Sequence, residues 1–237
     1  MFIVLEGPDG SGKSTQAGML FRRLQQRGIP ALLTREPGGT PVGCTIRDIL
    51  HQHNHVAISP QTELFLFCAD RAQHVQDVII PALRAGTVVV CDRFTDSTLA
   101  YQGYGHGLDL ATVEEVSRWS AGGIEPTLRI LLDLPVEEGL RRKQIALTQV
   151  DRKVGVTAEW TRMDALDVSF HRRVREGYLR LAASGRNWIT VDAAAPAEET
   201  HAAVWQAVAT QLGLHTRGGR PGGAIPPGET DGRRGKP

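Results

Sequence analysis

The stretch that most constrains the fold of this chain is residues 7–15, which read GPDGSGKST. They fit the pattern G-x-x-x-x-G-K-[ST] and stand between an apolar run at 2–6 and a helical pattern from residue 16 to 24. A strand, a glycine-rich turn and a helix in this order form a phosphate-binding loop (P-loop). Glycines let successive N–H groups face one anion, and the helix adds the positive end of its dipole. The sequence therefore predicts a nucleoside triphosphate site.

Within this loop, Lys13 is expected to reach the terminal phosphates and Ser14 to place its hydroxyl on Mg²⁺. A second metal-binding group is expected at Asp92, which ends the apolar run 87–92. A carboxylate at the end of a strand beside the P-loop can orient Mg²⁺ or its waters. The predicted ATP- and phosphate-binding residues are Gly7, Pro8, Asp9, Gly10, Ser11, Gly12, Lys13, Ser14 and Thr15, and the predicted metal ligands are Ser14 and Asp92.

Five strand-like runs, at 2–6, 29–34, 87–92, 128–133 and 187–191, alternate with helical patterns. This alternation predicts a three-layer α/β/α fold of the P-loop NTPase class, with a five-stranded parallel sheet. From His215 onward glycine, proline and arginine dominate, and such a segment buries too little apolar surface to order itself. We expect a kinase-like domain at 1–214 and a disordered tail at 215–237. A basic arm that contacts nucleic acid or a protein partner stays open as an alternative for the tail.

The bulk composition points to a small-molecule partner in the cytoplasm. The 237 residues carry a formal net charge of +1, so neither nucleic acid nor an acidic membrane is suggested as the main partner. Cys44, Cys68 and Cys91 lack metal-ligand spacing and suit a reducing compartment. The N-terminal run reads as a strand rather than a signal peptide, and no apolar run is long enough to span a bilayer.

Two helical spacings predict a pocket for a phosphate and a flat base. Arg93, Ser97 and Tyr101 are spaced i, i+4, i+8 and would share one helix face, where an arginine fork can hold a phosphate. Phe67 and Arg71, spaced i, i+4, would supply a ring for stacking and a donor for a carbonyl. Core packing for Phe67 and a surface ion pair for Arg71 are the simpler alternatives.

Other polar residues follow the second strand. Arg35 precedes a Pro-Gly-Gly turn and should lie at the carboxyl edge of the sheet, where ligands bind in open parallel sheets, and Arg47 lies on the next helix. His51, His53 and His55 alternate in a polar stretch and are expected to be solvated or hydrogen-bonded rather than metal ligands.

Four segments, 7–15, 35–40, 64–74 and 92–103, together resemble thymidylate kinases, a family of P-loop nucleoside monophosphate kinases. They occur in the family's order and at similar spacing, and the similarity runs from residue 1 to about 213. The resemblance implies transfer of the γ-phosphate of ATP to dTMP, which yields dTDP for dTTP biosynthesis. It also implies a Mg²⁺ requirement, a homodimer and a helical lid.

The resemblance assigns roles to individual residues. Phe67 would stack on thymine, Arg71 would donate to a thymine carbonyl, and Tyr101 would crowd the 2′ position of the sugar. The dTMP-binding residues that it implies are Asp9, Arg35, Phe67, Arg71, Arg93, Thr98, Tyr101 and Gln102. The catalytic residues that it implies are Asp9, Lys13, Arg93 and Arg162.

The P-loop carries Gly10 where one branch of the family carries a catalytic arginine, and in this respect the sequence resembles the branch that uses lid arginines. Arg162 falls at the lid-arginine position. The additional positive charge that faces the transferred phosphate would come from Arg162. It would act together with one or more of the basic residues Arg141, Arg142, Lys143, Arg152 and Lys153. Segment 144–161 is longer than usual, and a solvated helix face for 141–143 stays open. The small residues of 191–196 suit contact with adenine or a plain connection.

Two other functions compete with this one. A related nucleotide or deoxynucleoside kinase would need only a few changes in the base pocket. A non-catalytic nucleotide-binding regulator is disfavoured, because Lys13, Ser14, Asp92 and Arg93 are all present. A GTPase is less favoured still, since no Asn-Lys-x-Asp-like run for reading guanine occurs.

Overall fold

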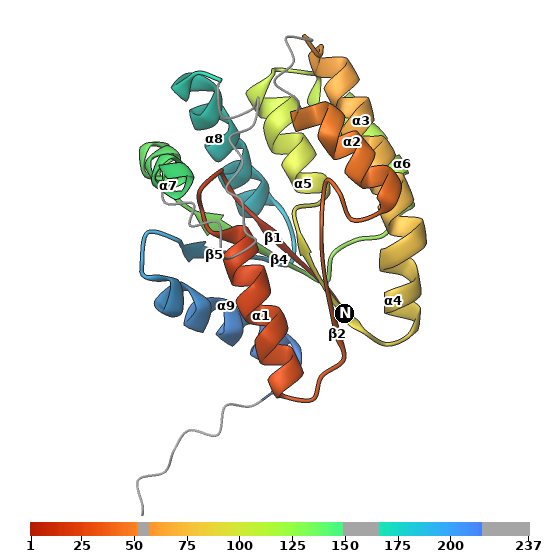
Figure 1. Cartoon of the computed structure of the whole chain (residues 1–237), viewed down its shortest axis with the longest axis vertical. Helices are drawn as coiled ribbons and strands as arrows, with labels where there is room; N and C mark the ends of the chain where they lie inside the picture. The colour runs from red at the N-terminus through yellow and green to blue at the C-terminus, as the bar shows by residue number, and fades with distance from the viewer. Residues whose placement is uncertain (52–56, 149–165, 215–237) are drawn as a thin grey trace, which may run out of the picture.

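A five-stranded parallel sheet forms the centre of the protein (Figure 1). The computed structural model describes residues 1–51, 57–148 and 166–214. The strands run in the order β2-β3-β1-β4-β5. Their bounds are Phe2–Glu6 for β1, Ala31–Arg35 for β2, Val88–Asp92 for β3, Leu128–Asp133 for β4 and Trp188–Asp192 for β5. All five predicted strands are confirmed, with β2 beginning two residues later than expected.

Helices cover both faces, which confirms the predicted three layers. One face packs against α1 (Lys13–Gln26) and α9 (Ala197–Gln211), which lie side by side in Figure 1. The elements on and around the other face are α2 (Pro41–His51), α3 (Pro60–His74), η1 (Val75–Ile79), α4 (Ile80–Arg84), α5 (Thr95–Thr98), η2 (Leu99–Gly105), α6 (Leu110–Ser120) and α8 (Val168–Ser184). A further helix, α7 (Val136–Thr148), follows β4.

The strand pleat divides the apolar side chains between these layers. In β1, Ile3 and Leu5 pack toward α1 and α9, whereas Phe2 and Val4 pack toward η1. All five residues of β1 and of β3 are buried, which explains why a parallel strand reads as an unbroken apolar run. Ser59, Asp109 and Asp167 begin their helices by accepting a hydrogen bond from a backbone N–H in the first turn.

The register of the sheet brings its functional ends together. Asp92 lies opposite Leu5 on one side and opposite Arg35 on the other. The carboxyl ends of β1, β2 and β3 therefore meet at one edge, beside the P-loop, as expected for a ligand site in such a sheet.

Several predictions concern residues outside this description. Arg152, Lys153, Arg162 and most of the predicted lid belong to 149–165, His53 and His55 to 52–56, and the predicted tail is 215–237. In the part that is described, no helix has the length and apolar character needed to cross a bilayer. Cys68 and Cys91 are buried, Cys44 is exposed, and all three are free thiols.

Candidate active site

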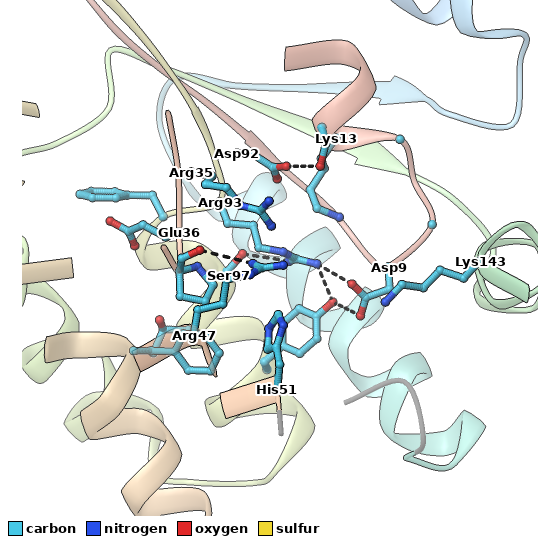
Figure 2. Close-up of a pocket in the computed structure, with 18 of the residues that line it drawn as sticks. Asp9, Lys13, Arg35, Glu36, Arg47, His51, Asp92, Arg93, Ser97 and Lys143 are labelled. Atoms are coloured by element: carbon cyan, nitrogen blue, oxygen red, sulfur yellow. Dashed lines mark hydrogen bonds and ion pairs between the residues drawn. The ribbon is translucent and has the colours of Figure 1, made fainter. Parts of the chain in front are cut away.

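A cavity of about 470 Å³ opens at the carboxyl edge of the sheet. Its volume falls within the usual range for small-molecule sites. The residues that line it come from the P-loop, β2, α2, α3, β3, α5, η2 and α7 (Figure 2). The predicted site residues among them are Asp9, Gly10, Gly12, Lys13, Ser14, Thr15, Arg35, Phe67, Arg71, Asp92, Arg93, Thr98, Tyr101 and Gln102.

The P-loop wraps around the first turn of α1. Gly12 has a φ of 86°, a left-handed conformation that suits glycine, and it begins the helix. The buried Nζ of Lys13 donates to the carbonyl oxygen of Pro8 at 2.8 Å and to the Ser11 hydroxyl at 3.4 Å. Burial lowers the pKa of this ammonium group to about 8. The predicted residues Gly7, Pro8 and Ser11 do not line the cavity. A Cβ on Gly7 would lie 2.5 Å from the carbonyl oxygen of Leu132.

The two predicted metal ligands are in direct contact. The hydroxyl of Ser14 donates to Oδ2 of Asp92. Oδ1 of Asp92 is buried and has no hydrogen-bond partner among the residues described. The Ser14 hydroxyl and the Asp92 carboxylate, with its unpartnered Oδ1 among the described residues, fit Mg²⁺. This ion prefers oxygen ligands and completes its coordination shell with phosphates and water.

Arg93 links the P-loop to α5, η2 and α8. Its Nη2 donates to Oδ1 of Asp9 at 2.7 Å and to the Tyr101 hydroxyl at 3.1 Å. Its Nη1 donates to the hydroxyls of Ser97 and Tyr178 at 3.1 and 3.0 Å. The predicted convergence of Arg93, Ser97 and Tyr101 is therefore confirmed, and Figure 2 shows the guanidinium directed at Asp9.

Asp9 carries the negative charge that faces this arginine. Tyr101 donates to its Oδ2 at 2.7 Å. Burial by itself would raise the pKa of the Asp9 carboxyl, but the positive charges of Arg93, Lys143 and Lys13 outweigh it and hold that pKa below its ordinary value. Asp9 is therefore ionised at neutral pH and neutralises part of the surrounding positive charge.

Glu6 is a site residue that the sequence analysis did not identify. Its fully buried carboxylate accepts hydrogen bonds from the backbone N–H of Phe94 at 2.9 Å and from the hydroxyls of Ser97 and Tyr178 at 2.6 and 3.1 Å. It thus holds the turn that follows Arg93. The available signal was an acid at the end of a buried strand, the same signal that identified Asp92.

Arg71 occupies the other end of the cavity and is buried. Its Nε pairs with Oε2 of Glu36 at 2.9 Å, and its Nη2 donates to Thr98 Oγ1 at 2.9 Å. Its Nη1 is buried and unpartnered within the described residues. The alternative of a surface ion pair is wrong, because the ion pair lies in the interior. Phe67 is half-buried and lines the cavity beside this guanidinium.

The basic cluster of α7 divides into three roles. Arg141 pairs with Glu138 and is largely exposed, as the solvated-face alternative expected. Arg142 also pairs with Glu138, and it donates to the carbonyl oxygens of Ala193 at 2.8 Å and Ala194 at 3.2 Å. Lys143 lines the cavity near Asp9 (Figure 2).

Gly10 packs directly on α7. A Cβ on Gly10 would lie 2.1 Å from the carbonyl oxygen of Gly139, so this arrangement has no space for a side chain at position 10.

The residues after β2 also reach the cavity. Arg35 and Arg47 line it, and Nη1 of Arg47 donates to the carbonyl oxygen of Pro37 at 3.4 Å. His51 is the last residue of α2 and lines the cavity as well, instead of lying in a polar loop as its sequence suggested.

Comparison with known proteins gives a consistent result. The family model described as thymidylate kinase matches residues 5–204. A thymidylate kinase of Thermomicrobium roseum is 48% identical over 208 residues, which cover 87% of this chain and 93% of the relative. One of Herpetosiphon aurantiacus is 45% identical over 208 residues, 81% of this chain and 88% of the relative. The crystal structure of thymidylate kinase from Ehrlichia chaffeensis is 27% identical, with a TM-score of 0.68, and the match covers 88% of this chain and 98% of that one.

Proposed function

The chain belongs to the thymidylate kinase family, and we propose that its cavity holds ATP and dTMP at opposite ends with Arg93 between them. The activity is transfer of a phosphoryl group from ATP to dTMP. The observation that carries the placement is one continuous cavity, lined by the P-loop and also by Phe67, Arg71, Thr98 and Gln102.

The P-loop end would bind the phosphates of ATP. The N–H groups of residues 7–15 and the N-terminus of α1 would cradle them, and Lys13 would turn from Pro8 toward the terminal phosphates. Ser14 and Asp92 would hold Mg²⁺, which when bound offsets the negative charge of the phosphates. Ala193 and Ala194, whose carbonyls accept from Arg142, suit the adenine.

The other end would bind dTMP. Phe67 would stack on thymine, and the unpartnered Nη1 of Arg71 would donate to a base carbonyl. Arg35 and Arg93 would bind the phosphate, while Asp9 would hold Arg93 in place and Tyr101 would crowd the sugar. Thr98 and Gln102 would read the base edge.

Catalysis in such a site rests on alignment and positive charge. The acceptor phosphate brings an oxygen that is already ionised near neutral pH, so the reaction needs no strong general base. Lys13 and Arg93, with Arg162 from outside the described residues, would stabilise the negative charge of the transferred phosphoryl group. Lys143 lies near Asp9 and is the basic residue of α7 best placed to join them.

The test is ADP release from the full chain with ATP and Mg²⁺ against dTMP, dUMP, UMP, dCMP, dAMP and dGMP. We expect strong preference for dTMP with dUMP a poor second. Lys13→Ala should retain the wild-type circular dichroism spectrum and lose at least about a hundredfold in kcat, as expected when charge on the transferred phosphoryl group is lost. Activity on a different monophosphate alone would overturn the base pocket, and near-normal kcat in Lys13→Ala would overturn the P-loop assignment.

The assembly, location and domain limits belong to the same proposal. The family's homodimer would form through α2 and α3, which pack together and expose Val42, Ile49 and Phe65. Large exposed apolar side chains on adjacent helices are a common mark of a protein interface. Free thiols suit the cytoplasm. We take 1–214 as the kinase domain and 215–237 as a tail outside it.

A further inference from the structure

Gln102 is held by a buried acid that no substrate would touch. Its Nε2 donates to Oε1 of Glu63 at 2.7 Å, and Nε2 of His106 lies 3.2 Å from the same oxygen. Glu63, on α3, is fully buried, and Gln102, on η2, is almost fully buried. Glu63 does not line the cavity, whereas Gln102 does. The carboxylate therefore lies behind a side chain of the base pocket.

This contact fixes which end of the amide faces the ligand. In the structure the Gln102 amide turns its NH₂ group toward Glu63, whose carboxylate oxygen accepts the hydrogen bond. The carbonyl oxygen of the Gln102 amide is then the group that does not contact Glu63. Among the residues described, none donates a hydrogen bond to that oxygen, and it is not sealed from solvent. The cavity thus receives an acceptor at position 102, not a donor.

An acceptor at this position distinguishes pyrimidines by their N3 atom. Thymine and uracil carry a hydrogen on N3 and a carbonyl at C4, while cytosine carries a bare N3 and an amino group. The Arg71 guanidinium would donate to the C4 carbonyl. The Gln102 oxygen would accept from N3–H and would face the N3 lone pair of cytosine unfavourably. An unpaired polar group in a closed site is a strong basis for discrimination.

We propose that Glu63 is a positioning residue that orients the Gln102 amide and so selects a 4-oxo pyrimidine over cytosine. The proposal rests on the proposed function, because it concerns the base end of the same cavity. His106 supports it, because its Nε2 lies within hydrogen-bond distance of the same Glu63 oxygen and its ring packs on Phe170 at a centroid distance of 4.8 Å. The contacts with Gln102 and His106 together hold the Glu63 carboxylate in place.

The experiment compares kcat and KM for dTMP and dCMP in the wild type and in Glu63→Gln. A glutamine at 63 can donate, so the amide of Gln102 is free to turn and offer NH₂ to cytosine N3. We expect the ratio of kcat/KM for dTMP to that for dCMP to fall at least about tenfold. The change should appear mainly in KM, because a base contact is made equally in the ground and transition states. Glu114→Gln, an exposed change on α6, is the matched control.

A reciprocal exchange separates orientation from simple structural support. Glu63→Gln with Gln102→Glu restores one N–H donor and one carboxylate across the contact, and still presents an oxygen to the cavity. We expect the dTMP preference of this double variant to return to within about threefold of the wild type, since the two residues are in contact and should couple. This variant also decides the matter if Glu63→Gln alone melts below the assay temperature.

The outcomes are distinguishable from failure of the proposed function. A wild type inactive on dTMP overturns that function. A wild type active on dTMP whose Glu63→Gln variant loses both substrates equally, with the ratio unchanged, overturns only the role of Glu63. A double variant that folds and still fails to recover the dTMP preference also overturns it.

Discussion

Arg93 has a strained backbone conformation, and both its backbone and its side chain are held by hydrogen bonds. Its φ of 75° is rare for a residue with a side chain and carries an energetic cost of about 1–2 kcal/mol. The conformation persists because neighbouring groups fix both ends of the residue. Its N–H donates to the carbonyl of Leu5 at 3.0 Å, and Glu6 binds the N–H of Phe94 immediately after it. The guanidinium is thereby aimed at the P-loop before any substrate arrives, as electrostatic catalysis requires.

Glu6 provides a prediction at the residue scale. Burial, with a smaller contribution from Asp96, raises the pKa of its carboxyl from 4.5 to about 7. A raised folded-state pKa stabilises the protein below the unfolded pKa, and that stabilisation is lost as the pH rises through the folded pKa. The free energy of unfolding should therefore fall between pH 5 and pH 8, with up to about 3 kcal/mol of the fall due to Glu6.

Urea unfolding of the wild type and of Glu6→Gln at pH 5, 6, 7 and 8 checks this expectation. The glutamine oxygen can still accept from Phe94 N–H, and the hydroxyls of Ser97 and Tyr178 can turn to accept from its amide. The variant should show a flatter pH profile than the wild type. Parallel profiles would show that Glu6 does not titrate in this range.

At the scale of elements, α7 is attached to both parts of the predicted ATP site. Gly139 lies against the P-loop, where an added Cβ would sit 2.3 Å from the carbonyl oxygen of Asp9. Three residues further on, Arg142 binds the carbonyls of Ala193 and Ala194 after β5. Helix α7 is therefore positioned by the P-loop on one side and by the connection between β5 and α9 on the other.

Gly139→Ala tests this attachment. The Asp9 carbonyl is backbone and cannot turn aside, so α7 or the P-loop must shift. We expect a loss of about 1–3 kcal/mol in the free energy of unfolding, typical of overpacking, together with a raised KM for ATP. Gly18→Ala in α1 is the matched control, because its Cβ would meet only the Arg22 side chain at 3.5 Å. That change should stabilise by up to about 1 kcal/mol through helix propensity. Equal effects of the two changes would contradict the proposed docking of α7.

The helical segment after β3 is less regular than its sequence predicts. The sequence predicts one regular helical face through Arg93, Ser97 and Tyr101. The chain instead forms a short α-helix, α5, and then the wider π-helical turns of η2. Such turns are frequent at functional sites. They leave Tyr101 against Asp9 and Arg93, while the next residue, Gln102, faces Glu63.

At the scale of the whole molecule, the exposed apolar residues of α2 and α3 test the proposed homodimer. Phe65 is 61% exposed and Val42 is 51% exposed. Phe65→Glu should give a molar mass of one chain by light scattering at concentrations where the wild type has the mass of two. Leu179→Glu, an equally drastic change at an exposed position of α8, should leave the wild-type mass unchanged. A dimer that survives Phe65→Glu would place the interface elsewhere.

The C-terminal tail provides a second whole-molecule prediction. Residues 216–237 come after α9 in the chain and carry few apolar side chains. Their deletion should leave kcat and both KM values within about twofold of the wild type, because a segment of this composition buries too little apolar surface to form part of a packed site. A large rise in either KM would assign the tail to the active enzyme.

The sequence by itself determined the sheet, the P-loop and the convergence on Arg93. Five apolar runs in βα alternation were enough for the layers, and the spacing of 7–15 was enough for the loop, because both are encoded in neighbouring residues. The same holds for Arg93, Ser97 and Tyr101, which lie close together in one segment, although that segment is not one regular helix and Arg93 precedes α5. Phe67 and Arg71 were found in the same way, but their spacing alone could not tell a buried ion pair from a surface one.

Only the tertiary structure decided which residues from distant parts of the chain contact one another in the site. Glu6 meets Tyr178 across 172 positions of sequence, Glu63 meets Gln102 across 39, and Arg142 meets Ala193 across 51. Gly10 and Gly139 likewise touch only because β4 delivers α7 to the P-loop. The spacing of neighbouring residues in the sequence does not predict such long-range pairs. They exist because folding buries a polar group, and a buried polar group is stable only where the chain supplies its partner from another element.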